Sequence, residues 1–184
     1  MSDQPFEKIG PGVWAAAAGL VTVDPAAAAF LESRLAETPR RRVRLCAHRG
    51  PGAPLQEMFI LLAEDTYIRP HRHTGKVESL HVIAGQADAV FFDEAGAVAA
   101  VVPLGAPGSG RAFYYRVDTP RFHTLVLRSE RFFFHEATTG PFRPEETAFA
   151  PWAPGEEDPA GAARYRADLE RQVRTFTGAQ RDAT

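Results

Sequence analysis

The sequence predicts one domain with an all-β core, a sandwich or barrel, and a helix at each end. Short runs rich in Val, Ile, Phe and Tyr recur between residues 43 and 137, among them RVRLCAH, EMFILLA, ADAVFFD and AFYYRV. Turn signals such as RGPGAP, DEAG and GAPGSG separate the runs. Many short strands at this spacing are typical of β-sandwiches and barrels, and no internal repeat is visible.

The first 36 residues read as an extension built around one helix. Short strands are expected at residues 13–16 and 20–23. The stretch DPAAAAFLESRLAET predicts a helix, because Asp24 can cap its first turn and Pro25 suits the first helical position. The Ala, Leu and Glu residues that follow favour its continuation.

The barrel is expected over residues 37–154, and its first strand carries the basic run PRRRVRLCAHR. Such a run is either a solvated edge strand, where charge discourages aggregation, or a phosphate-binding patch. The Pro-rich stretch GPFRPEETAFAPWAPGEEDP then predicts an extended strap over the sheet, with Trp152 as its anchor. Residues 155–184 form a C-terminal helix and tail, with the helix starting near Asp158 and a frayed end at GAQRDAT.

Composition limits the function classes. The 184 residues carry a formal net charge of −2, which argues against a general nucleic-acid binder. Cys46 is the single cysteine, so no internal disulfide can form. The N-terminus MSDQPFEKIG lacks the pattern of a signal peptide, and no apolar run approaches the roughly 20 residues that span a bilayer. We expect a cytoplasmic protein with no nucleic-acid or membrane partner.

The segment PHRHTGKVESLHVIAG indicates a metal site. His71 and His73 lie two residues apart, so in a strand both side chains point to one face. Glu78 follows a short turn and returns beside them in a hairpin. Two imidazoles and a carboxylate suit a first-row divalent metal with open positions. His81 has the opposite strand parity from Glu78, so we predict that it is not a ligand.

A fourth ligand is predicted on the later strand in TPRFHTLVL, where His123 shares a face with Leu125 and Leu127. The expected cofactor is one divalent transition metal, which the sequence leaves open among Zn, Fe, Mn and Ni. Ligand distances of about 2.0–2.3 Å are expected.

Other polar residues are candidates for the pocket around the metal. Strand alternation places Arg69 and Tyr67 on the face of His71, where an Arg can hold a carboxylate or phosphate. Lys76 in the turn is either a general acid or anion clamp, or a solvated lysine. The sequence does not decide which of Tyr114 and Tyr115, or of His135 and Glu136, faces the cavity. The predicted catalytic residues are Lys76 and Tyr115, and the predicted substrate-binding residues are Arg69, Tyr67, Arg116 and His135.

The spacing of His71, His73, Glu78 and Gly85, with His123 on a later strand, resembles the two motifs of the cupin superfamily. Residues 37 to about 154 resemble more closely the WbuC family of cupin fold metalloproteins, through TYIRPHRHTGKVESLHVIAG, FYYRV, FHTLV and HEATTGPF. The resemblance implies a cupin double-stranded β-helix, that is a jelly-roll barrel, with short helices at both termini. It also implies a bound metal and a link to bacterial O-antigen or other surface polysaccharide synthesis.

Three functions remain open at this point. The first is a metal-dependent enzyme, such as an isomerase or epimerase, on a sugar or sugar phosphate. The second is an Fe(II)-dependent dioxygenase, and the third is a binding module in which the metal organises a ligand without turnover. Metal and cations together favour a small anionic ligand. By analogy with related barrels, which often pair through edge strands, we expect a homodimer.

Overall fold

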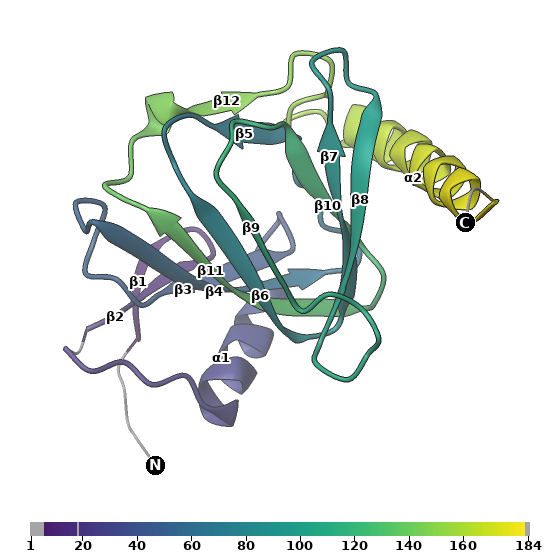
Figure 1. The fold of residues 1–184 in the computed structure, drawn as a ribbon. Coiled ribbons are helices and arrows are strands. Elements are labelled where there is room, and N and C mark those ends of the chain that lie inside the picture. Colours follow the sequence, from purple (N-terminus) through teal and green to yellow (C-terminus); the bar gives the residue numbers. More distant parts are fainter. Residues whose placement is uncertain (1–5, 18, 183–184) are drawn as a thin grey trace.

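The computed structural model describes residues 6–17 and 19–182, which form two facing β-sheets flanked by helices (Figure 1). The topology is a double-stranded β-helix, so the predicted fold class is confirmed. The first sheet has the order β1 (Phe6–Gly10), β2 (Val13–Ala16), β3 (Arg42–Cys46), β4 (Leu55–Ala63), β11 (Arg131–Thr139), β6 (Glu78–Ala84) and β9 (Tyr114–Val117). The second has the order β12 (Thr147–Phe149), β5 (His71–His73), β10 (His123–Leu127), β7 (Gln86–Phe92) and β8 (Val98–Gly105).

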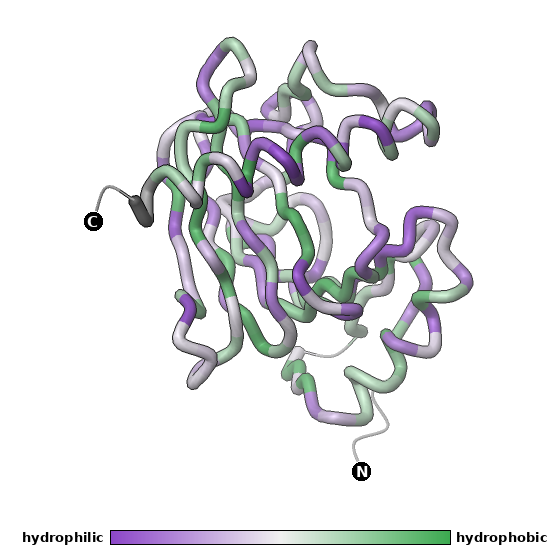
Figure 2. Tube along the Cα trace, turned by 90° about the vertical axis from the view of Figure 1, so that its right-hand side faces the viewer, coloured by the Kyte–Doolittle hydropathy of each residue, from purple (hydrophilic) through white to green (hydrophobic). Residues whose placement is uncertain are grey.

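Side chains of alternating residues point into the space between the sheets. On β11, Phe132 and Phe134 point inward and contact a cluster that includes Leu80 from the same sheet and Phe91 from the other. Phe133, between them, belongs to a second cluster on the outer face. Figure 2 shows the result along the chain, where hydrophobic and hydrophilic residues interchange at short intervals within the strands.

Helix α1 (Pro25–Leu35) covers the outer face of the first sheet (Figure 1). The carboxylate of Asp24 accepts a hydrogen bond from the backbone N–H of Ala27 at 2.9 Å, as an N-cap does. Leu31 and Leu35 are fully buried against β3 residues that point away from the barrel. The helix and its predicted cap are confirmed.

Helix α2 (Pro159–Asp182) packs on the outer face of the second sheet through Leu169 and Val173 (Figure 1). The segment before it includes the 3₁₀ turn η1 (Pro144–Glu146) and strand β12, and ends at Trp152, whose ring contacts Phe92 and Phe122. The predicted strap and anchor are therefore present. The predicted frayed end is helical through residue 182, and residues 183–184 lie outside the described residues.

The N-terminal half differs from the sequence predictions in three respects. Strand β1 was not predicted, and residues 20–23 form no strand. Strand β3 is no edge strand, because β2 pairs with it in parallel on one side and β4 pairs with it on the other. These pairings join residues far apart in the sequence, so local patterns do not reveal them.

Among the described residues, neither helix combines the length and apolarity needed to cross a membrane.

In the turn between β6 and β7, adding one methyl group at Gly85 is expected to destabilise the fold. Gly85 has a φ of +83°, and a Cβ there would overlap the backbone carbonyl of Arg131. We expect Gly85→Ala to lower the free energy of unfolding by more than the ~1 kcal/mol that left-handed strain alone costs. Gly108→Ala is the matched control, because its φ of +87° is similar but its Cβ would meet open space. Urea unfolding of both variants checks this, and equal losses would contradict it.

Candidate metal centre

Three histidines converge where strands β5, β6 and β10 meet. Strand β5 lies between β10 and β12, and His71 is directly opposite His123 in the antiparallel pair. One ring nitrogen from each of His71, His73 and His123 lies within 4.8 Å of the others. The i, i+2 spacing on β5 thus brings both imidazoles to one point, as the sequence predicted.

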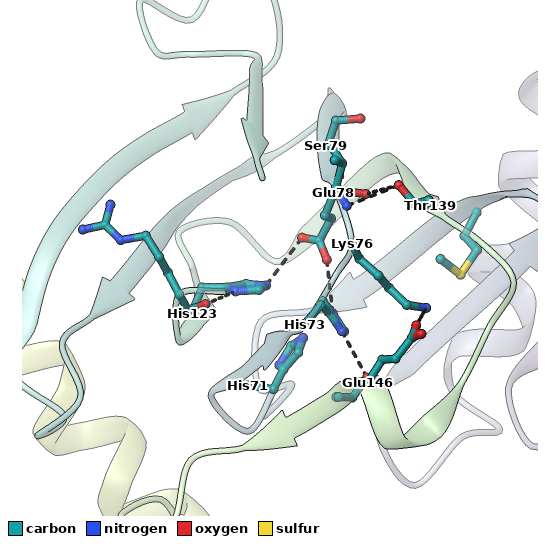
Figure 3. A network of polar contacts seen from close by, with 12 residues as sticks. His71, His73, Lys76, Glu78, Ser79, His123, Thr139 and Glu146 are labelled. Atoms are coloured by element: carbon teal, nitrogen blue, oxygen red, sulfur yellow. Dashed lines mark hydrogen bonds and ion pairs between the residues drawn. The ribbon is translucent and has the colours of Figure 1, made fainter. Parts of the chain in front are cut away.

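Glu78 completes the group from the first residue of β6. Its Oε2 lies 3.3 Å from Nε2 of His73, and its Oε1 lies 3.5 Å from Nε2 of His123 (Figure 3). The carboxylate is 5% exposed, so its charge is removed from bulk water. The structure therefore brings together all four residues that the sequence named as ligands.

The outer nitrogen of each imidazole is already hydrogen-bonded. Nδ1 of His71 donates to the carbonyl of Arg69 at 2.9 Å, and Nδ1 of His123 donates to that of Arg121 at 2.9 Å. Nδ1 of His73 lies 3.0 Å from the hydroxyl of Thr147. Where Nδ1 carries the proton, Nε2 presents its lone pair to the centre, which is how ligating histidines are oriented. The donor set fits a divalent transition metal.

Electrostatics agree with a site for a cation. Burial, reinforced by the neighbouring His123, lowers the pKa of His71 to about 3, so this imidazole is neutral at physiological pH. Burial opposes ionisation of Glu78, but hydrogen bonds from His123 and His73 outweigh it and hold its pKa below the usual range. Burial also lowers the pKa of His123, yet the bond to Glu78 overrides this and raises it. A divalent cation would compete with the proton on His123.

The four residues line the wall of a cavity of about 1410 Å³. Tyr115 faces into it from β9 and donates its hydroxyl to Oε1 of Glu78 at 3.4 Å. Burial, followed by the charge of Glu78, raises the pKa of this phenol well above its ordinary value, so it is a proton donor. Tyr114 is 49% exposed on the other face, which settles the question that the sequence left open.

Lys76 and Arg69 also line the cavity, in different surroundings. Nζ of Lys76 is buried, 3.4 Å from the carboxylate of Glu146, so this lysine is not the solvated residue of the alternative interpretation. Arg69 donates to the carbonyl of Ala150 at 2.9 Å and stacks over the ring of Phe149 at 5.3 Å. Its Nε is buried without a hydrogen-bond partner, and within the described chain it forms no ion pair.

Tyr67 is not in this cavity, which corrects one prediction. Its hydroxyl donates to the carbonyl of Pro154 at 2.8 Å, and its ring meets Tyr165 beneath α2. The expected strand alternation does not reach Tyr67, because β5 begins only at His71. Tyr67 therefore stabilises the docking of the C-terminal segment.

Arg116 and His135 point away from the cavity, which corrects two further predictions. Arg116 is opposite Ser79 on the outer face and pairs with Asp118 at 2.8 Å. His135 packs on Phe59 with ring centroids 4.8 Å apart. On each strand the neighbouring residue, Tyr115 or Glu136, takes the inward position. His81 is opposite His135 in the pairing of β6 and β11, so its predicted place outside the metal site agrees with the structure.

Two cavity-lining residues of the first sheet, Arg44 and Glu136, were not among the predicted site residues, although Glu136 was left open as the alternative to His135. The alternation of Arg42 and Arg44 with Val43 and Leu45 was a usable signal. It predicts a strand with one charged face and one apolar face, and the sequence left the charged face open between solvent and a phosphate-binding patch.

Glu136 makes stability depend on pH. Burial, followed by the charge of Glu78, raises its pKa from the ordinary 4.5 to about 8. The folded chain then holds a proton that the unfolded chain releases, so this group lowers stability progressively as pH rises from 4.5 to 8. We expect Glu136→Gln to raise the melting temperature, relative to wild type, more at pH 8 than at pH 5. Calorimetry of chelator-treated proteins measures this, and a constant difference would refute it.

Comparison with known proteins gives a family match over part of the chain. Residues 24–104 match the family described as a domain of unknown function (DUF6016). No curated protein matches the chain. The fold is that of a cupin, as the paired sheets and strand order show. The family match includes His71, His73 and Glu78 but ends before His123.

Solved structures with similarity to the chain have low identity. Protein SO0799 from Shewanella oneidensis is 16% identical over 58% of this chain and 72% of its own, with a TM-score of 0.48. L-ribose isomerase from Cellulomonas parahominis is 14% identical over 60% and 70%, with a TM-score of 0.47. A double-stranded β-helix protein from Klebsiella pneumoniae is 15% identical over 59% and 79%, with a TM-score of 0.46.

Proposed function

We propose that this protein binds one divalent transition metal through His71, His73, Glu78 and His123 and uses it to convert a small anionic sugar derivative. The observation that supports this most directly is the convergence of three imidazoles and one carboxylate at the wall of a large cavity. A metal ion held by these four residues keeps a coordination position open for a substrate oxygen.

The proposed reaction is an isomerisation or epimerisation. The metal supplies Lewis acidity toward a carbonyl or hydroxyl oxygen of the substrate. Tyr115 keeps its proton at neutral pH and can donate it to a substrate oxygen beside Glu78. Arg69 offers the guanidinium to a carboxylate or phosphate. Lys76, held by Glu146, contributes positive charge at the same wall.

The proposed substrate class is a sugar or sugar phosphate of bacterial surface polysaccharide synthesis. The likeness of residues 37–154 to the WbuC family supports this assignment, and the cations in the cavity agree with an anionic substrate. The reaction would occur in a chain that pairs with a second copy, as the edge strands of such barrels permit.

Elemental analysis and turnover together test the proposal. Protein purified without added metal is expected to contain close to one equivalent of Zn, Mn, Fe or Ni. Incubation with aldose, ketose and hexose phosphates, followed by ¹H NMR, is expected to show interconversion that chelation abolishes. Tyr115→Phe should reduce turnover without lowering metal content. Dioxygen uptake with bound Fe would instead show an oxygenase, and metal-dependent binding without turnover would show a binding module.

A further inference from the structure

Arginine side chains from β3 enter the same cavity from the side opposite the metal. Arg42 and Arg44 alternate along β3 with Val43 and Leu45, which are fully buried against α1. The alternation turns both arginines to the concave face, where they line the cavity with the metal-site residues. The basic run is therefore an inner wall of the cavity.

The positive charge of this wall is only partly balanced. Glu156 is shared by two arginines, at 2.9 Å from Nε of Arg40 and 3.5 Å from Nη2 of Arg42. Arg44 has a different environment, since its Nη1 lies 3.7 Å from the sulfur of Met58. Across the described parts of the chain, no carboxylate forms an ion pair with Arg44. A partly buried guanidinium with a thioether as its polar contact is available to an anion.

The arginine wall and the metal site are far enough apart for two ends of one ligand. Strands β4 and β11 lie between β3 and β6, and the register places Arg44 level with Val82, four residues from Glu78. Three strand spacings of about 4.8 Å and four residues of about 3.4 Å put the backbones of Arg44 and Glu78 roughly 20 Å apart. Both side chains extend into the cavity and shorten this gap. The cavity of about 1410 Å³ exceeds the roughly 300–1,000 Å³ of typical small-ligand pockets.

The floor between the two sites is largely apolar. Glu136 lies there on β11 as a buried carboxyl group. Its neighbours across the sheet are apolar, with Met58 on one side and Leu80 on the other. An uncharged chain of carbons and hydroxyls can therefore cross this floor.

We propose that Arg44, assisted by Arg42, binds a terminal phosphoryl group of an elongated ligand whose other end reaches the metal centre. The metal end rests on the proposed function, whereas the arginine end rests on β3 alone. The guanidinium forms paired, charge-assisted hydrogen bonds to two phosphoryl oxygens, a geometry that lysine does not reproduce. The ligand class is a phosphorylated sugar acid or sugar in which the phosphate lies several carbons from the metal-binding oxygens.

Calorimetric titration of protein loaded with one equivalent of zinc tests the proposal with three probes. The first, 6-phosphogluconate, has a metal-binding end and a distant phosphate. Gluconate lacks the phosphate, and 3-phosphoglycerate is too short to join both sites. Wild type is expected to bind 6-phosphogluconate about tenfold or more tighter than gluconate, as a charged hydrogen bond requires.

Variants of Arg44 test the phosphate end of the ligand separately from the metal-binding end. Arg44→Gln should remove the preference for 6-phosphogluconate over gluconate and leave 3-phosphoglycerate binding unchanged. Arg116→Gln is the control, because that arginine is on the outer face. Arg44→Lys, which keeps the charge, should retain part of the preference and guards against a folding defect in the Gln variant. A melting curve of each variant accompanies the titration.

Failure of the phosphoryl subsite and failure of the metal-centred function give different results in these titrations. Equal binding of 6-phosphogluconate to wild type and Arg44→Gln would overturn the phosphoryl subsite while leaving metal-dependent binding intact. If chelator-treated wild type binds all three probes as tightly as the zinc-loaded protein, the metal-centred function fails. In that case a surviving preference for 6-phosphogluconate that depends on Arg44 would still support the subsite.

Discussion

Replacing His73 with Ala is expected to reduce bound metal from close to one equivalent to near zero in protein dialysed against buffer. Nε2 of this imidazole lies 3.3 Å from Glu78, inside the group that we propose as ligands. Loss of an outer hydrogen-bond partner alone costs metal sites roughly 10–100-fold in affinity. Loss of a direct ligand should exceed that. Inductively coupled plasma mass spectrometry of wild type and variant measures the content.

His81→Ala is the matched control for this experiment. His81 is on β6, the strand that begins at Glu78, but its ring faces outward, 5.7 Å from the ring of Phe113. The variant should keep the wild-type metal content. Equal losses in both variants would show that the site is not where β5 and β6 place it.

Replacing Phe132 with Ala should cost about 3–5 kcal/mol of the free energy of unfolding, the range found for large buried aromatics. The ring is 0% exposed and lies 5.1 Å from the ring of Phe134, within the cluster that joins the two sheets. Its loss leaves a cavity that rigid strands on both sides cannot close. Chemical denaturation monitored by circular dichroism measures the change.

Phe113→Ala is the surface control for this change in the free energy of unfolding. Phe113 is 49% exposed, so truncating it removes little buried area, and the cost should stay below about 1 kcal/mol. A similar loss for both variants would mean that the inner cluster is loosely packed.

The fold was predictable for strands that show a clear hydrophobic pattern in their own residues. Alternation and turn residues located most of the strands, and the cap at Asp24 located α1. Strand β1 escaped because FEKIG has no clear alternation, and its pairing with β2 supplies the reason it is a strand. The inner position of β3 also depends on pairing, which brings residues together across long stretches of chain.

The candidate site was predictable where spacing fixes direction, as for His71 and His73 on β5. Glu78 was expected beside them in a hairpin, but β5 and β6 lie in different sheets, so the turn between them carries Glu78 to the facing sheet. Arg116 and His135 were assigned inward although each is one residue from the inward position, and a register error of one residue reverses the face. Tyr67 was misplaced because alternation was extended across Pro70 into a segment that is not a strand.

Strand β5, the short strand that carries His71 and His73, depends on the C-terminal segment for one of its two strand pairings. Strand β12 pairs with β5 so that Thr147 is opposite His73 and Phe149 is opposite His71. The C-terminal segment thereby holds the histidines from behind, and Thr147 orients one of them directly. Local opening of this segment would release the imidazoles, so cation occupancy and closure of the segment are thermodynamically linked. A bound cation should slow hydrogen exchange of the β12 amides by the same factor with which closure of the segment strengthens cation binding.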